Sequence, residues 1–312
     1  MSLANTLFLL SYIPSLCAAV SNDPRGPPPN PLSRRASKNV PSQGYYDPLD
    51  SGGGMLTQVP DTYPAGLGEP INVILSGNSD AAVLVDQQSD GGLRNYYQSL
   101  GFSSECLGQH SGSDQAANLG DGNGYKNETA VIRWDYGDPA FGTCTETVEG
   151  GNHFRYWVQD GPDKDSGAIF MALSYEKPIA LGHDIIVNGY NLARDWLIGN
   201  ATGQSIPTAN LTNSSSYSGS TSAQGYTYQT SVNYVSGLLQ NTSDGINHYL
   251  TVGVNGSNAI DGLVAVMEVH ISARPAGTSD ALSWRLTSPW SWNLPTLLNL
   301  GVLLILPLYA LS

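Results

Sequence analysis

The side chains best suited to acid–base chemistry are histidines and aspartates in the middle of the chain, because imidazole and carboxylate are the usual groups for proton transfer. In the segment NHFRYW, His153 and Arg155 lie two residues apart, so on a β-strand they share one face. We single out His153 as the candidate catalytic residue of a surface hydrolase. Its partner would be Asp121 or Asp135, and Arg155 would polarise the substrate. The alternative is that these side chains only bond neighbouring backbone or water.

No established catalytic motif accompanies these residues. The sequence contains no HExxH, GxSxG or phosphate-binding Gly-rich motif and no paired-cysteine metal site. We therefore expect no metal ion and no cofactor, and we favour a non-enzymatic protein over an enzyme. The aromatic residues of this region have two interpretations: they stack on sugar rings, or they belong to the core, as strand aromatics commonly do. They are Trp134, Tyr136, Tyr156 and Trp157.

The elements that must position these side chains centre on a β-hairpin between Gly150 and Pro178. Residues 153–158 alternate between two faces, as in a strand, and the polar GPDKDSG follows as the turn. Residues 168–173 are apolar on both faces, which predicts a central strand covered on each side.

Two helices and further strands are expected around this hairpin. Apolar residues at helical spacing predict a helix over 93–100, capped by Asp90 and stopped by Gly101, and a second helix around Tyr190 that ends at Gly199. This order predicts a single, loop-rich α+β domain, in which two short helices pack on one face of a mainly antiparallel sheet. The other expected strands are 71–75, 131–136, 249–254 and 264–271.

Composition divides the chain into a folded middle and two distinct ends. An apolar run followed by small residues predicts a signal peptide, and a proline-rich stretch predicts a disordered spacer. The predicted segments are a signal peptide at 1–19, a Pro/Gly-rich spacer at 20–65, the globular domain at 66–273 with a glycosylated insertion at 200–225, a spacer with a lipid-anchor attachment site at 274–293, and a hydrophobic tail at 294–312.

Charge argues against two classes of partner. Charged residues make up only 12% of the chain, and the formal net charge is −13. Nucleic acids and anionic membrane surfaces are bound through clustered Lys and Arg, which are scarce here. We therefore expect no nucleic-acid partner.

Cysteines and sequons both indicate an extracellular protein. Without the signal peptide, Cys106 and Cys144 remain as a pair, which predicts one disulfide in an oxidising compartment; the alternative is two free or metal-binding thiols. Asn-x-Ser/Thr sequons predict N-glycosylation and surface exposure of the segments that carry them. They lie at Asn127, Asn200, Asn210, Asn213, Asn241 and Asn255.

The C-terminal tail has the pattern of a lipid-anchor signal. Such a signal needs small residues at the attachment site, a polar spacer and an apolar tail. Ser279 fits as the site, with Gly277 as the alternative, and residues 294–312 form the apolar tail. The competing interpretation is a transmembrane helix, but no Lys or Arg follows the tail to hold a cytoplasmic end.

The chain resembles the LssY-type C-terminal domain, a module of unassigned function in bacterial membrane proteins. The matching stretches, in order, are GEPINVILSG, GGLRNYYQSLGF, NHFRYW, AIFMALSYEKP and NLARDWL. The resemblance implies that His153 and Arg155, with Arg194 and Asp195, are the polar positions that matter. The chain also looks like a type of secreted fungal protein without assigned activity. Neither resemblance implies a reaction.

Together these features predict a secreted surface glycoprotein without an identifiable reaction. We expect it to be anchored to the plasma membrane or cell wall and to contact wall polysaccharide. The alternative is the surface hydrolase built around His153.

Overall fold

The computed structural model describes residues 39–276, apart from Ser111 and Asn255. The predicted signal peptide, the first part of the spacer, the attachment site at Ser279 and the tail lie outside these residues. Within them, no helix is both long enough and apolar enough to cross a membrane.

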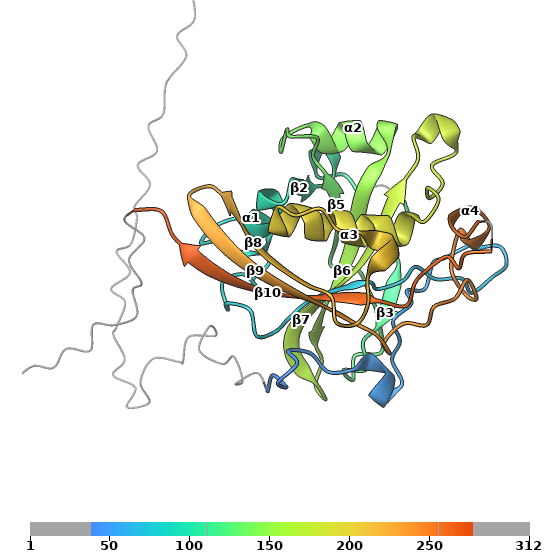
Figure 1. The fold of residues 1–312 in the computed structure, drawn as a ribbon, viewed down its shortest axis with the longest axis horizontal. Coiled ribbons are helices and arrows are strands. Elements are labelled where there is room, and N and C mark those ends of the chain that lie inside the picture. The colour runs from blue at the N-terminus through green and yellow to red at the C-terminus, as the bar shows by residue number, and fades with distance from the viewer. Residues whose placement is uncertain (1–38, 111, 255, 277–312) are drawn as a thin grey trace, which may run out of the picture.

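One curled sheet of eight strands organises the domain, in the order β2-β5-β6-β7-β1-β10-β9-β8 (Figure 1). All neighbouring strands are antiparallel except β1 and β10, which confirms the predicted α+β class with a mainly antiparallel sheet. The strands are β1 (Val73–Leu75), β2 (Phe102–Ser104), β5 (Ala130–Trp134), β6 (Gly151–Asp160), β7 (Asp165–Glu176), β8 (Ser216–Ala223), β9 (Tyr226–Val235) and β10 (Val264–Ala273), with β3 (Ala116–Asn118) and β4 (Tyr125–Asn127) paired separately.

The helices are short. The α-helices are α1 (Leu93–Ser99), α2 (Gly142–Glu149), α3 (Gly189–Thr202) and α4 (Tyr249–Val252), and the 3-10 turns are η2 (Pro48–Ser51), η3 (Cys106–Gly108), η4 (Ile179–Leu181) and η5 (Thr208–Asn210). The segment 249–254, expected as a strand, therefore begins as a helical turn.

The predicted hairpin is confirmed as β6 and β7, with Arg155 opposite Ala172. Because successive residues point to opposite faces, Phe154 and Tyr156 enter one core while His153, Arg155 and Trp157 face the other way. The first core is covered by α1 and α3, and α3 crosses in front of the sheet in Figure 1. The second core lies under loops and the N-terminal segment.

The helix boundaries differ from those predicted. Asp90 does not cap α1; its N-cap is Gly92, while Gly101 follows the helix with a φ of 82° as expected of a stop signal. Helix α3 runs past Gly199 and ends at Gly203, whose φ of 68° is in the left-handed region that glycine tolerates without a Cβ clash.

Two predicted segment boundaries are wrong. The disordered spacer does not reach residue 65, because Tyr45 and Met55 are buried in the second core and Tyr46 bonds the side chain of Gln159. The insertion at 200–225 is only partly a loop. It contains the end of α3 and all of β8, an edge strand that pairs with β9 along its whole length.

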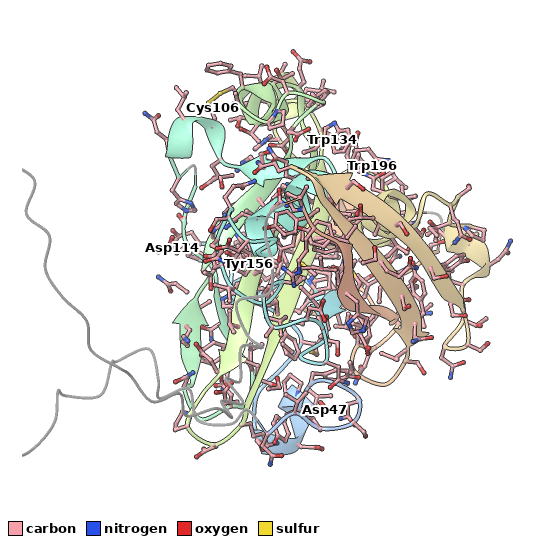
Figure 2. The ribbon with its side chains drawn as sticks, turned by 90° about the vertical axis from the view of Figure 1, so that its left-hand side faces the viewer. Asp47, Cys106, Asp114, Trp134, Tyr156 and Trp196 are labelled. Carbon is pink, nitrogen blue, oxygen red and sulfur yellow. A yellow bond between two sulfur atoms is a disulfide. The ribbon has the colours of Figure 1, made fainter. Side chains whose placement is uncertain are left out.

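The predicted disulfide is confirmed: Cys106 of η3 is bonded to Cys144 of α2. The sulfur–sulfur bond is visible near Cys106 at the top of Figure 2. It ties α2 to the loop that follows β2, so the helix that covers this end of the sheet is fixed covalently.

Candidate functional site

Charged side chains line one face of β5, β6 and β7 beneath α2. Arg133 lies opposite His153 in the sheet, and His153 lies opposite Ser174. Glu176 follows Ser174 by two residues and therefore points to the same side. From above, α2 contributes Glu146, whose side chain has no exposed surface.

Glu146, His153 and Glu176 form what we call the buried His/Glu cluster. Nδ1 of His153 lies 3.8 Å from Oε1 of Glu146, and Nε2 of His153 lies 3.6 Å from Oε1 of Glu176. Nη1 of Arg133 donates to Oε2 of Glu146 at 2.9 Å. At the outer edge, Nε2 of His183 lies 2.8 Å from Oε2 of Glu176. With Arg133 and His183, the cluster therefore joins one helix, three strands and a loop.

Burial shifts the pKa values of Glu146 and His153 in opposite directions. Loss of solvation raises the pKa of Glu146 to about 7, although Arg133 opposes the shift. Burial also lowers the pKa of His153 to about 3, so the imidazole is neutral at ordinary pH. For Glu176 burial favours a higher pKa, but the contact with His183 and the charge of Arg133 outweigh it and the pKa falls. Its contact with Glu176 raises the pKa of His183. Perturbed carboxyl and imidazole groups of this kind can transfer protons or bind a metal ion.

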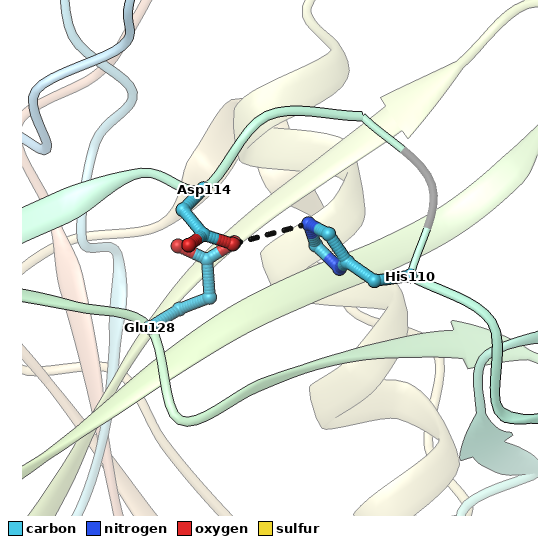
Figure 3. A group of neighbouring side chains, drawn as sticks. All are labelled: His110, Asp114 and Glu128. Atoms are coloured by element: carbon cyan, nitrogen blue, oxygen red, sulfur yellow. Dashed lines mark ion pairs between the residues drawn. The ribbon is translucent and has the colours of Figure 1, made fainter.

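A second, more exposed group consists of His110, Asp114 and Glu128 (Figure 3). Nε2 of His110 lies 3.3 Å from Oδ1 of Asp114, and its Nδ1 is paired with Glu105 at 2.9 Å. Glu128 pairs with Arg155, 3.3 Å from Nε. Arg155 therefore belongs to this group and not to the buried His/Glu cluster, although it shares a strand face with His153.

The two aspartates predicted as partners of His153 lie elsewhere. The carboxylate of Asp121 accepts the backbone N–H of Asp160, at the far end of β6 and seven residues, or roughly 23 Å, from His153. The carboxylate of Asp135 accepts bonds from Ser103 of β2 and from the N–H of Gly137, on the side of β5 away from β6. The carboxylates that face His153 are those of Glu146 and Glu176.

Arg194 and Asp195, the other polar positions in the family resemblance, form a buried ion network in α3. The guanidinium of Arg194 is fully buried and donates to both oxygens of Asp195 and both oxygens of Asp261. Tyr234 of β9 donates to Asp195 at 2.8 Å. The network joins α3 to β9 and to the loop before β10, so its role is structural.

The aromatic residues divide between core and surface. Tyr156 and Trp157 are buried, at 0% and 2% exposure, so the core interpretation holds for them. Trp134 packs 4.4 Å from Trp196 of α3 between ring centroids, and the two lie together in Figure 2. Tyr136 contacts Trp134, and Tyr175 contacts Trp196. We call these four partly or largely exposed rings the aromatic row.

The sequon asparagines are not equivalent. Asn200 lies in α3, where its Nδ2, the atom that would carry a glycan, donates to the carbonyl of Leu100 at 3.0 Å. Asn255 is outside the described residues. The exposed sequon asparagines are Asn127, Asn210, Asn213 and Asn241.

Sequence reasoning missed Glu146 and Glu176 as neighbours of His153. Glu176 carried a usable signal, because Ser174 and Glu176 make the end of an otherwise apolar strand polar on one face. No local pattern indicates Glu146, since α2 reaches the sheet through tertiary contacts. Trp196 was expected only as a flank of its helix.

Neither the known protein families, nor the curated proteins, nor the solved structures include a match to this chain. The resemblance to the LssY-type domain therefore stays a prediction.

Proposed function

We propose that the protein is an extracellular glycoprotein, held at the plasma membrane or wall, whose domain contacts polysaccharide through the aromatic row. The observation that carries the proposal is the exposure of Tyr136: its side chain is 46% exposed and lies at the end of that row. Aromatic rings offer a large apolar face to the C–H groups of a sugar at little cost in side-chain entropy. The disulfide and the exposed sequons suit the same extracellular setting.

The orientation of the rings indicates the kind of glycan. Neighbouring planes in the row are inclined by 55° to 60°. Such a row cannot lie flat on a crystalline polysaccharide, but it can contact successive sugars of a single twisted chain. We therefore propose soluble or loosely packed glycan chains as the ligand.

The backbone of Tyr136 supports a role beyond packing. Its φ of 51° is unfavourable for a bulky residue, and such strain persists where the surroundings enforce it. Here the N–H of Gly137 bonds Asp135 and the hydroxyl of Tyr136 donates to the carbonyl of Gly150 at 2.7 Å. The ring is thus held in place at the surface before any ligand arrives.

A glycan array with the full-length protein tests the proposal. We expect binding to one class of wall oligosaccharide, weakened about 2- to 10-fold by Tyr136→Ala, because one ring contact contributes ~0.5–1.5 kcal/mol. The control is Tyr125→Ala, which removes a more exposed ring, at 57%, on β4. The proposal is wrong if no glycan is retained, or if the Tyr125 variant loses binding and the Tyr136 variant does not.

Attachment through a glycolipid at Ser279 is a separate proposal. It is supported by the small residues at that site and the apolar tail at 294–312. Phosphatidylinositol-specific phospholipase C should release the protein from intact cells. If the protein stays with the membrane and a tag placed after Ser312 survives, the tail is a spanning helix.

The hydrolase built on His153 is not carried further. His153 is 3% exposed and faces neither Asp121 nor Asp135. The carboxylates that do face His153 are those of Glu146 and Glu176, and they suit a different role.

A further inference from the structure

The buried His/Glu cluster has the donor set of a metal site. One oxygen of Glu146, one of Glu176 and one ring nitrogen of His153 all lie within 4.8 Å of one another. Two carboxylates and an imidazole are typical ligands of Zn²⁺ and related divalent ions. Ca²⁺ fits poorly, because it takes six to eight oxygens.

In this cluster Oε2 of Glu176 is buried without a hydrogen-bond partner, and so are two atoms that face each other, Oε1 of Glu146 and Nδ1 of His153. Both side chains are more than nine-tenths buried. Buried polar atoms are nearly always paired, so two such atoms facing each other need an explanation. At 3.8 Å they are too far apart for a hydrogen bond. Two ligands each ~2.1 Å from one tetrahedral ion are ~3.4 Å apart, close to the observed spacing.

The remaining polar atom of each side chain already has a partner that would orient it. Oε2 of Glu146 accepts from Arg133 at 2.9 Å. Nε2 of His153 lies 3.3 Å from the hydroxyl of Ser174. Such outer contacts fix the tautomer and direction of metal ligands.

Glu176 faces the other nitrogen of the same ring. Its Oε1 lies 3.6 Å from Nε2 of His153, and its Oε2 lies 2.8 Å from Nε2 of His183. Because one ligand atom from each of the three side chains lies within 4.8 Å of the others, a single ion can draw on all three.

We infer that Glu146, His153 and Glu176 bind one divalent transition-metal ion, for which Zn²⁺ is the probe, and that His183 positions Glu176 from the solvent side. Three protein ligands leave a fourth coordination position for water. The ion would tie α2 to β6 and β7 at the end of the sheet that the disulfide also secures. This site is independent of the proposed glycan contact.

Metal binding to the full-length protein, purified in detergent without metal-chelating resins, tests the inference. The measurements are bound metal by elemental analysis and Zn²⁺ titration by calorimetry after removal of metal with a chelator. We expect one Zn²⁺ per chain and a thermal midpoint that rises with added Zn²⁺, because a ligand that binds only the folded state stabilises it. Glu176→Gln should abolish the binding.

His183→Gln covers the case in which the buried Glu176 variant does not fold, because His183 lies on a partly exposed loop. It should weaken Zn²⁺ binding by about 10- to 100-fold, as loss of an orienting partner does. The matched control is His110→Gln, in the exposed group of Figure 3, which should leave the affinity unchanged. The inference is overturned if the wild-type protein shows no saturable Zn²⁺ binding, if the His183 variant binds as tightly as wild type, or if the His110 variant loses the ion instead.

Discussion

Replacing Arg194 with methionine is expected to lower the free energy of unfolding by about 3–5 kcal/mol. Arg194 is fully buried, with donor–acceptor distances of 2.7 and 3.1 Å to Asp195 and 2.8 Å to each oxygen of Asp261. It also donates to the carbonyl of Leu263 at 2.8 Å. Five charge-assisted bonds at ~1.5–3 kcal/mol each would overstate the loss, because burying the ions already offsets most of that gain. The net cost is set by Asp195, which is 3% exposed and would be left as an unpaired charge.

Urea unfolding followed by circular dichroism measures this cost. Arg94→Met is the control, because Arg94 pairs with Asp86 near the surface and its loss should cost less than about 1 kcal/mol. Combining Arg194→Met with Asp195→Asn should restore part of the stability, since the second change removes the stranded charge. A loss below about 1 kcal/mol for Arg194→Met, or a double variant less stable than that single variant, would refute this account.

Three other expectations concern covalent links and pH. Replacing Cys106 and Cys144 by alanine should cost roughly 3–4 kcal/mol in urea unfolding, the chain-entropy value for a 38-residue separation, and intact stability would contradict it. Peptide mass spectrometry should find Asn200 unmodified, because it lies half-buried in helix α3 with its Nδ2 bonded to a backbone carbonyl, while the exposed sequons carry glycans; a glycan on Asn200 would contradict this. Bonds to Asp80 and Glu268 raise the pKa of His270, so its contribution to stability is complete below about pH 6.5 and is lost as the pH rises through the higher folded value. His270→Gln should remove that dependence from unfolding curves measured between about pH 5 and 9.

Local patterns were enough to predict the hairpin and its neighbours. The alternation at 153–158 and the apolar run at 168–173 depend only on the two-residue period of a strand, and both strands form as expected. The disulfide was predictable because only two cysteines follow the predicted signal peptide. Such features need no knowledge of the rest of the chain.

The missed elements lack a local signal. Strand β8 reads SYSGSTSA, whose small polar side chains resemble a linker, and it forms because β9 and α3 cover it. Helix α2 has little amphipathic character and is held by the disulfide and by the bond from Arg133 to Glu146. In the N-terminal segment, Tyr45 and Met55 are isolated buried residues in a polar context, which composition cannot distinguish from spacer.

The buried His/Glu cluster could not be predicted for a related reason. His153 was singled out as a candidate catalytic residue with Asp121 or Asp135 as its partner, but its actual neighbours depend on strand register and on how α2 docks. A shift of one residue between β6 and β7 would turn Glu176 to the opposite face. Asp121 and Asp135, the aspartates predicted as partners, carry the same carboxylate group, but they accept hydrogen bonds in turns and at strand ends.

The position of β8 at the rim of the sheet has a consequence for how copies of the protein meet. β8 is an edge strand of eight residues without a charged side chain, and separate chains can join into continuous sheets along such edges, although the carbonyl of Ser218 already accepts from the side chain of Gln204. Asn210 and Asn213 lie in the segment that leads into this strand. Glycans at these predicted sites would stand beside the edge as a hydrated steric barrier, keeping neighbouring molecules apart where the strand itself offers no charge repulsion.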